Sequence, residues 1–380
     1  MCSGLYIHIP FCHSKCSYCD FFSTPAMTKY QHEYIQALLC ELKLRCNEVP
    51  TPFDTVYIGG GTPSILDKTS ITTLLAGIKP YISADFREFT VEVNPEDVSE
   101  DFIETLIAGG VNRISMGVQS FDDDTLRMVS RRHSSTCAID AINIIKQYGL
   151  NYSLDIIYGL PTGREDASMI NTFEYSLNKL LSFEPPHFSA YLLSYEQGTK
   201  MYFMREKGVI KEATEEEATQ MYSLLCNIAR SHGYNHYEIS NFAKSGSEAV
   251  HNSKYWAGMP YLGIGCSAHS YDLSLRRYNP NNIPQYIRSL NDFGKTVFET
   301  EILTPEDKYN DFIITSLRTN AGLDLDKLNH LMPSYLTDYF KHTIEPLFAS
   351  GQLIKLNNHL YIPENQWLVS DSIMRDLMYV

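Results

Sequence analysis

The chain has 380 residues, of which 44% are hydrophobic and 20% charged, as expected of an ordinary globular protein with one large domain and a smaller one. Its formal net charge of −14 argues against a nucleic-acid-binding surface, because phosphate binding needs a basic stripe. The number of cysteines, nine, is odd. We find no cationic apolar leader and no apolar run near the roughly 20 residues that cross a bilayer. We therefore expect a cytoplasmic protein with mostly free thiols.

Short β-branched or aromatic runs alternate six times with amphipathic helical patterns. One helix is predicted to begin after Ser99 and end at Gly109, and another begins with a Thr214-x-x-Glu217 capping box. Repeated βα units imply a parallel sheet, and six units are too few for a closed eightfold barrel. We therefore predict an α/β fold, a laterally open, partial (βα)6 barrel of the TIM type, over residues 1–233. Its strands are predicted at residues 5–9, 55–58, 89–93, 113–118, 152–157 and 187–192.

Three cysteines follow the first predicted strand with C-x3-C-x2-C spacing: Cys12, Cys16 and Cys19. Three thiolates so close in sequence cannot all pair as disulfides, but they can ligate one inorganic centre. A [4Fe–4S] cluster held by three thiolates keeps one iron open to an external ligand, whereas a structural zinc site normally has four protein ligands. The spacing alone leaves open a zinc site completed by His13 or by a distant histidine.

Polar residues at the ends of the other strands are expected to share one face with these cysteines, because loops after the strand carboxyl ends form the functional face of such a barrel. After the second strand comes the glycine-rich stretch 59–63, where missing side chains let a ligand reach backbone N–H groups. Glu92 and Asp155 interrupt apolar strands, and a buried carboxylate is costly unless something pairs with it. For Glu92, an ion pair with Arg113 or Arg131 is the alternative explanation.

The cysteine spacing resembles the signature of the radical S-adenosylmethionine (SAM) superfamily. The preceding stretch 6–12, YIHIPFC, more narrowly resembles the oxygen-independent coproporphyrinogen III oxidase family and its heme-chaperone branch, HemW. The resemblance implies that Cys12, Cys16 and Cys19 hold a [4Fe–4S] cluster. It also implies a set of residues that bind SAM: Tyr6, Tyr18, Gly60, Gly61, Thr62, Glu92, Gln119, Arg131 and Asp155.

From about residue 234 to 302 the pattern changes to short β-prone pieces and turns, including residues 237–239, 250–256 and 261–271, so we predict a β-rich extension. The stretch 251–256, HNSKYW, resembles the HNxxYW motif associated with heme binding in the chaperone branch, which implies His251 as a heme ligand. From the residues alone, a satisfied loop histidine is the alternative. His269 is a second, weaker candidate.

The last part, residues 303–380, is predicted to be a small helical, winged-helix-like domain. Thr304 and Pro305 are typical of a helix start. Two short β-prone runs flank Asn357-Asn358 as a hairpin, before a final helix.

Two departures separate the chain from the oxidase that it resembles. Phe21 stands where the oxidase has a fourth cysteine, and the chain has no counterpart of the oxidase's N-terminal extension. We therefore expect a HemW-type heme chaperone that binds a [4Fe–4S] cluster, SAM and heme, and that delivers heme to a client hemoprotein. We also expect an electron donor, which the sequence does not identify, and peripheral association with a membrane during delivery. We expect no nucleic-acid partner and no membrane span. The alternative is an oxygen-independent coproporphyrinogen III oxidase, so the sequence leaves enzyme activity open.

Overall fold

The structure is a computed structural model that describes residues 3–164 and 166–380. A curved sheet runs through its larger part, with the strand order β12-β11-β10-β9-β1-β2-β3-β4-β5-β6-β8-β7. The six central strands pair in parallel, as predicted. They are β1 (Gly4–Ile9), β2 (Thr55–Gly60), β3 (Glu88–Val93), β4 (Arg113–Gln119), β5 (Asn151–Tyr158) and β6 (His187–Leu192).

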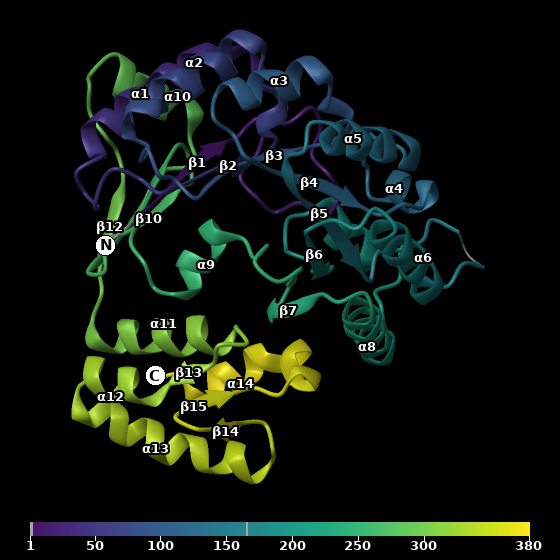
Figure 1. The fold of residues 1–380 in the computed structure, drawn as a ribbon, viewed down its shortest axis with the longest axis vertical. Coiled ribbons are helices and arrows are strands. Elements are labelled where there is room, and N and C mark those ends of the chain that lie inside the picture. The colour runs from purple at the N-terminus through teal and green to yellow at the C-terminus, as the bar shows by residue number, and fades with distance from the viewer. Residues whose placement is uncertain (1–2, 165) are drawn as a thin grey trace.

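Helices cover the convex face of this arc (Figure 1). Ser99 and the Thr214–Glu217 capping box begin α3 and α8 as predicted. Leu5 and Ile7 of β1 are fully buried in the main core, and alternation along the strand turns Tyr6 and His8 toward the concave side. The helices are α1 (Gln31–Arg45), α2 (Lys68–Ile78), α3 (Glu100–Ala108), α4 (Asp123–Met128), α5 (Ser135–Gln147), α6 (Met169–Leu181) and α8 (Glu215–Ser231).

The segment 234–302 extends the same sheet at both of its edges. β9 (Tyr261–Ile264) runs parallel to β1, and β10 (His269–Tyr271), β11 (Leu275–Tyr278) and β12 (Glu299–Ile302) continue outward in antiparallel fashion. β8 (Asn241–Ala243) and β7 (Asn235–Glu238) extend the sheet beyond β6. Helix α10 (Ile283–Asn291) packs beside α1. With β12 and β7 at its two edges, the described sheet is an open arc and not a closed barrel.

The prediction of a β-prone piece at residues 250–256 is wrong, because this stretch forms the helix α9 (Val250–Trp256) on the concave side of the arc (Figure 1). The carboxylate of Glu88 on β3 accepts the backbone N–H groups of Val250 and His251, at 2.7 and 3.1 Å. A carboxylate at a helix start satisfies N–H groups that have no partner within the helix. This cap comes from a distant strand, so the local pattern does not reveal it.

The C-terminal unit lies across the concave side of the arc (Figure 1). It consists of helices and short strands, as predicted for a winged-helix-like domain. Asn357, at the turn of the predicted hairpin, has a positive φ of 54°. The unit contains α11 (Pro305–Leu317), β13 (Leu323–Asp324), α12 (Leu325–Leu331), α13 (Ser334–Ala349), β14 (Ile354–Leu356), β15 (His359–Tyr361), the 3-10 helix η5 (Glu364–Val369) and α14 (Ser370–Leu377).

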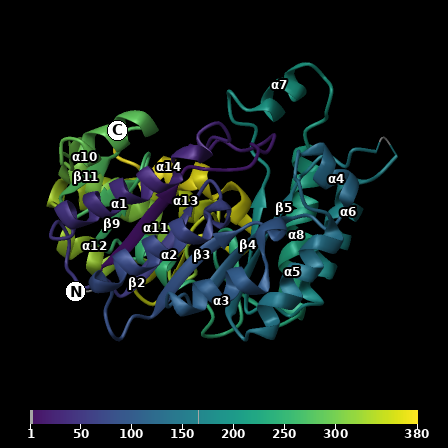
Figure 2. The ribbon, with the colours of Figure 1, turned by 90° about the horizontal axis from the view of Figure 1, so that it is seen from above.

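Short elements surround the carboxyl ends of the central strands. The loop after β1 and helix α7 (Lys200–Glu206) lie side by side at this end of the sheet (Figure 2), joined by a 2.8 Å hydrogen bond from the Met201 N–H to the Ser17 carbonyl. Among the described helices, none is long and apolar enough to cross a membrane. The remaining 3-10 turns are η1 (Thr28–Tyr30), η2 (Pro63–Ile65), η3 (Lys79–Tyr81) and η4 (Pro95–Asp97).

Candidate functional site

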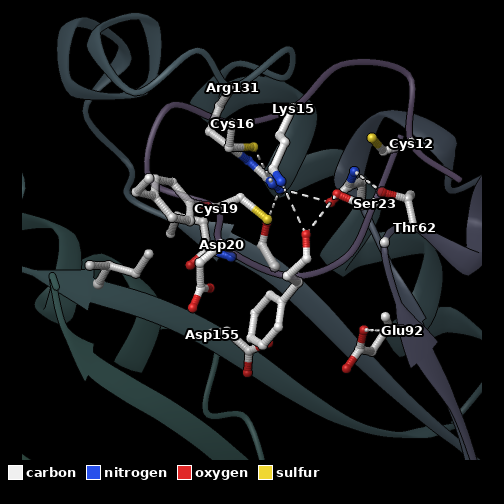
Figure 3. A pocket seen from close by; sticks show the side chains of 18 of the residues that line it. Cys12, Lys15, Cys16, Cys19, Asp20, Ser23, Thr62, Glu92, Arg131 and Asp155 are labelled. Carbon is white, nitrogen blue, oxygen red and sulfur yellow. Dashed lines mark hydrogen bonds between the residues drawn. The ribbon is translucent and has the colours of Figure 1, made fainter. Parts of the chain in front are cut away.

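A pocket of about 440 Å³ opens at the carboxyl ends of the central strands, between the loop after β1 and the ends of β2 to β6. In Figure 3 the three cysteines lie on one side of this pocket, and Glu92 and Asp155 lie on the other. The strand-end argument therefore predicted the correct face of the sheet. The predicted site residues that line the pocket are Cys12, Cys16, Tyr18, Cys19, Gly60, Gly61, Thr62, Glu92, Gln119, Arg131 and Asp155.

The cysteine loop is held in place by contacts with the residues that follow α4. The Ser17 N–H donates to the Val129 carbonyl at 3.0 Å, and the Ser17 and Ser130 hydroxyls lie 2.7 Å apart. These bonds fix the middle of the loop against the barrel, so the three thiols face the pocket together.

The three thiols do not form a compact group of metal-ligand atoms. One group of three His, Cys or carboxylate side chains among the described residues has all its ligand atoms within 4.8 Å of one another, and it does not contain these cysteines. In a tetrahedral zinc site, sulfur atoms lie only about 3.8 Å apart, given Zn–S bonds of about 2.3 Å. His13, one candidate for the fourth ligand in the zinc alternative, pairs with Asp97 at 3.3 Å. Three cysteine ligands that do not converge on one point are compatible with a cluster that carries several metal ions.

Burial raises the pKa of the thiols of Cys12 and Cys19 above the usual cysteine value. Their thiolate forms therefore need a nearby positive charge, which a metal centre supplies when it is bound. The positive charge of Lys15 lowers the pKa of both thiols in part, and Arg131 Nη1 lies 3.5 Å from the Sγ of the third cysteine, Cys16.

Three buried polar atoms around the pocket have no hydrogen-bond partner among the described residues: Arg131 Nε, Gln119 Oε1 and Asp155 Oδ1. Such atoms are rare in folded proteins and costly. Gln119 also adopts a positive φ of 68°, in the left-handed region that few residues other than glycine prefer. Both observations fit a wall that is built to receive a polar ligand.

Glu92 accepts hydrogen bonds from the Tyr57 hydroxyl at 2.7 Å and from the Gly60 N–H at 3.1 Å. Burial raises the pKa of its carboxyl to about 7. Among the described residues, Glu92 forms no ion pair with Arg113 or Arg131. The alternative explanation of Glu92, an ion pair with one of these arginines, is therefore wrong.

The glycine-rich loop after β2 has no room for side chains. A Cβ at Gly60, whose φ is +116°, would lie 2.6 Å from the His8 ring. A Cβ at Gly61 would lie 2.6 Å from the Phe11 carbonyl oxygen, in the cysteine loop. The missing side chains thus let this loop approach the backbone that carries the cysteines.

Asn94 is a pocket residue that the sequence argument missed. Its Oδ1 accepts from Arg131 at 2.9 Å, and its amide donates to the Thr62 hydroxyl at 3.3 Å. It follows β3 directly, so its position at a strand end was an available signal. Other lining residues without a predicted role include Lys15, Ser115 and the stretch from Tyr191 to Ser194.

Two predicted site residues do not line the pocket. Tyr6 lies beneath it, where its hydroxyl is 3.0 Å from His8 Nδ1 and its ring stacks on Tyr57 at 6.2 Å. His251 is 1% exposed and packs against Gly4 at the amino end of β1. The position of these side chains along the barrel axis depends on strand register, which the sequence motif does not give.

His251 is a satisfied buried histidine. Its Nδ1 lies 3.0 Å from the Thr55 hydroxyl and its Nε2 lies 2.9 Å from the Tyr255 hydroxyl. Burial lowers its pKa to about 3, so the ring is neutral. His251 is therefore buried in this arrangement, and its role as a heme ligand stays a prediction. The weaker candidate, His269, is exposed on β10, and its ring packs edge-on against Tyr278 at 4.7 Å.

Comparisons with known proteins give a consistent result. Residues 6–173 match the radical SAM superfamily, and residues 303–369 match the HemN C-terminal domain. The heme chaperone HemW of Bacillus subtilis is 32% identical over 97% of this chain and 97% of its own length. HemW of Lactococcus lactis is 31% identical over 96% of this chain and 92% of its own length. The structure of HemN from Escherichia coli, a coproporphyrinogen III oxidase described as a radical SAM enzyme, superposes with a TM-score of 0.84 at 23% identity, covering 99% of this chain and 90% of that one.

Proposed function

This chain belongs to the HemW family of the radical SAM superfamily, and we propose that it is a heme chaperone that binds a [4Fe–4S] cluster and SAM and delivers heme to a client hemoprotein. The observation that carries the proposal is the pocket itself. Three cysteines line one side of it, and Gln119 and Asp155, each with an unpartnered polar atom, line the other.

In this proposal the thiolates of Cys12, Cys16 and Cys19 would hold the cluster. When they are bound, the reduced cluster and SAM supply one-electron cleavage of a carbon–sulfur bond. The guanidinium of Arg131 places a positive charge 3.5 Å from the Cys16 sulfur, and it is itself oriented by Asn94. Lys15 lines the same wall and adds a second positive charge.

The opposite wall is proposed to bind SAM. The loop with Gly60, Gly61 and Thr62 offers backbone groups to the amino-acid part, and the Glu92 carboxylate accepts hydrogen bonds from ribose hydroxyls, as the family resemblance implies. Gln119 and Asp155 on this wall, and Tyr18 and Arg131 beside the cysteines, are proposed to provide further contacts. Tyr6 acts indirectly, because it stacks on Tyr57, which donates to Glu92.

Heme is the cargo of the proposed chaperone. With both ring nitrogens hydrogen-bonded, His251 can ligate heme iron only after its ring gives up the contact with Thr55 on β2 or the contact with Tyr255 within α9. We expect the electron donor and the client hemoprotein to be separate proteins, and delivery to be compatible with peripheral association at a membrane.

The test separates the chaperone from the coproporphyrinogen III oxidase, the alternative that the family resemblance leaves. The cluster-loaded protein is incubated anaerobically with SAM, a reductant and coproporphyrinogen III, and in parallel it is loaded with heme and mixed with an apo-hemoprotein. The chaperone predicts no protoporphyrinogen IX, and transfer of the heme Soret band to the acceptor. Accumulation of protoporphyrinogen IX, or failure to bind heme at micromolar concentration, would reject it.

A heme titration of His251→Ala tests the ligand separately. Loss of the Soret band in this variant, with unchanged far-ultraviolet circular dichroism, supports ligation by His251. An unchanged band assigns the heme to other residues and leaves the chaperone proposal intact.

A further inference from the structure

Three potential metal ligands meet outside the main pocket, where the barrel contacts the C-terminal unit. Cys226 comes from α8, His236 from β7 and Glu364 from η5. One ligand atom from each lies within 4.8 Å of the other two. They line a separate cavity of about 190 Å³, which has room for an ion and a water molecule.

The imidazole of His236 is rigidly held. Its ring stacks on Phe242 with centroids 4.1 Å apart and packs edge-on against Trp367 of the C-terminal unit at 4.4 Å. The side chain is only 5% exposed. A ligand fixed in this way loses little conformational freedom when it binds a metal.

The hydrogen bonds of His236 aim a lone pair into the cavity. Its Nε2 lies 3.1 Å from the carbonyl oxygen of Ile239, which can only accept, so Nε2 carries a hydrogen. In the neutral ring, Nδ1 is then an acceptor, yet it lies 3.2 Å from Glu364 Oε1, another acceptor. A cation or an additional proton must lie between these two atoms.

The Cys226 thiol completes the group, with its Sγ 3.9 Å from His236 Nδ1. Arg230 contacts the other carboxylate oxygen of Glu364, Oε2, whereas Oε1 faces His236 Nδ1. Thiolate, imidazole and carboxylate are all zinc ligands, and metal-bound histidines usually donate their second N–H to a carbonyl, as His236 does to Ile239.

We propose that Cys226, His236 and Glu364 bind one Zn²⁺ ion, with water in the fourth position. Binding releases the proton of the Cys226 thiol to solvent and leaves the imidazole neutral. Because Glu364 belongs to the C-terminal unit and the other two ligands to the barrel side, the ion ties these two parts together. The two parts are also joined directly at this point, by the 3.2 Å hydrogen bond from the Tyr222 hydroxyl to the Glu364 carbonyl.

The test uses the full chain with its cluster assembled, so that Cys12, Cys16 and Cys19 do not compete for the added metal. Zinc is added at micromolar concentration, excess metal is removed by dialysis, and bound zinc is measured per chain. Cobalt(II) then replaces zinc, because a cobalt–thiolate bond gives a near-ultraviolet charge-transfer band. If the cluster does not assemble, the same titration is made with the triple variant Cys12→Ser, Cys16→Ser, Cys19→Ser. This variant has lost the cysteines of the cluster site and keeps Cys226.

We expect one zinc per chain and a cobalt–thiolate band in the wild type. Cys226→Ser and Glu364→Gln should each weaken zinc binding at least about tenfold, and Cys226→Ser should abolish the band. Cys40→Ser, which removes another partly buried thiol, is the matched control and should keep both signals. Bound zinc should also raise the thermal midpoint of the wild type and not that of Cys226→Ser.

Absence of bound zinc in the wild type at micromolar free zinc would overturn the proposal. An unchanged cobalt spectrum in Cys226→Ser would also overturn it. In either case His236 and Glu364 form an ordinary ion pair. Circular dichroism of both single variants shows whether a lost signal reflects misfolding, and serine for cysteine is close to isosteric.

Discussion

Replacing Glu92 with glutamine removes a buried charge while keeping the side-chain shape. Burial raises the pKa of this carboxyl from 4.5 to about 7. The folded protein therefore holds the Glu92 proton more tightly than the unfolded chain does, and the free energy of unfolding falls as the pH rises from below 4.5 through 7. At about 1.4 kcal/mol per pKa unit, the loss at pH 8 is about 3 kcal/mol, of which about 2.5 kcal/mol appears between pH 5 and 8.

Glutamine has no proton to lose in this range. Its amide oxygen can accept from the Gly60 N–H, and its amide N–H can donate to the Tyr57 hydroxyl, so neither hydrogen bond needs to be lost. Urea unfolding of the ligand-free protein at pH 5, 6, 7 and 8 measures the effect. We expect Glu92→Gln to gain about 2.5 kcal/mol relative to the wild type between pH 5 and 8. Glu345→Gln, at an exposed helical position, is the control. A Glu92→Gln stability difference that does not change with pH would refute the buried-carboxyl reasoning.

Three further predictions concern the pocket. Cys12→Ser should lose the cluster, measured as iron and sulfide per chain after anaerobic reconstitution, whereas Cys137→Ser should keep it; equal iron in both would contradict the ligand assignment. Arg131→Lys loses the contacts with Cys16 and Asn94, and it should weaken SAM binding about tenfold, or about 1.4 kcal/mol, by calorimetry; an unchanged Kd would show that the guanidinium is not needed. Gly61→Ala forces a Cβ against the Phe11 backbone and should destabilise the protein by about 1–3 kcal/mol in urea unfolding; wild-type stability would mean that the loop shifts freely.

The sequence predicts the core of the fold because each central strand and helix carries its own periodic pattern. The six parallel strands follow from apolar runs, and the helix starts follow from capping residues such as Ser99 and Thr214. Helix α9 escapes this reasoning because its cap, Glu88, is contributed by β3. No local pattern contains that information.

The edge of the sheet at which the pocket lies can also be predicted from the sequence. Parallel strands bring their carboxyl ends to one edge of a sheet, so Glu92 and Asp155 are expected beside the cysteine loop. Depth along the barrel is not predictable in this way: Tyr6 and His251 fall below the pocket because of strand register and the placement of α9. The group of Cys226, His236 and Glu364 has no motif spacing, since its members meet only through tertiary packing.

The most direct test of the account is electron paramagnetic resonance of the anaerobically reconstituted, reduced protein with and without SAM. Three-cysteine ligation predicts about four irons per chain and a cluster signal that changes when SAM is added, because one iron lacks a protein ligand. A signal that SAM does not alter, or one bound zinc and no iron at these cysteines, would contradict it.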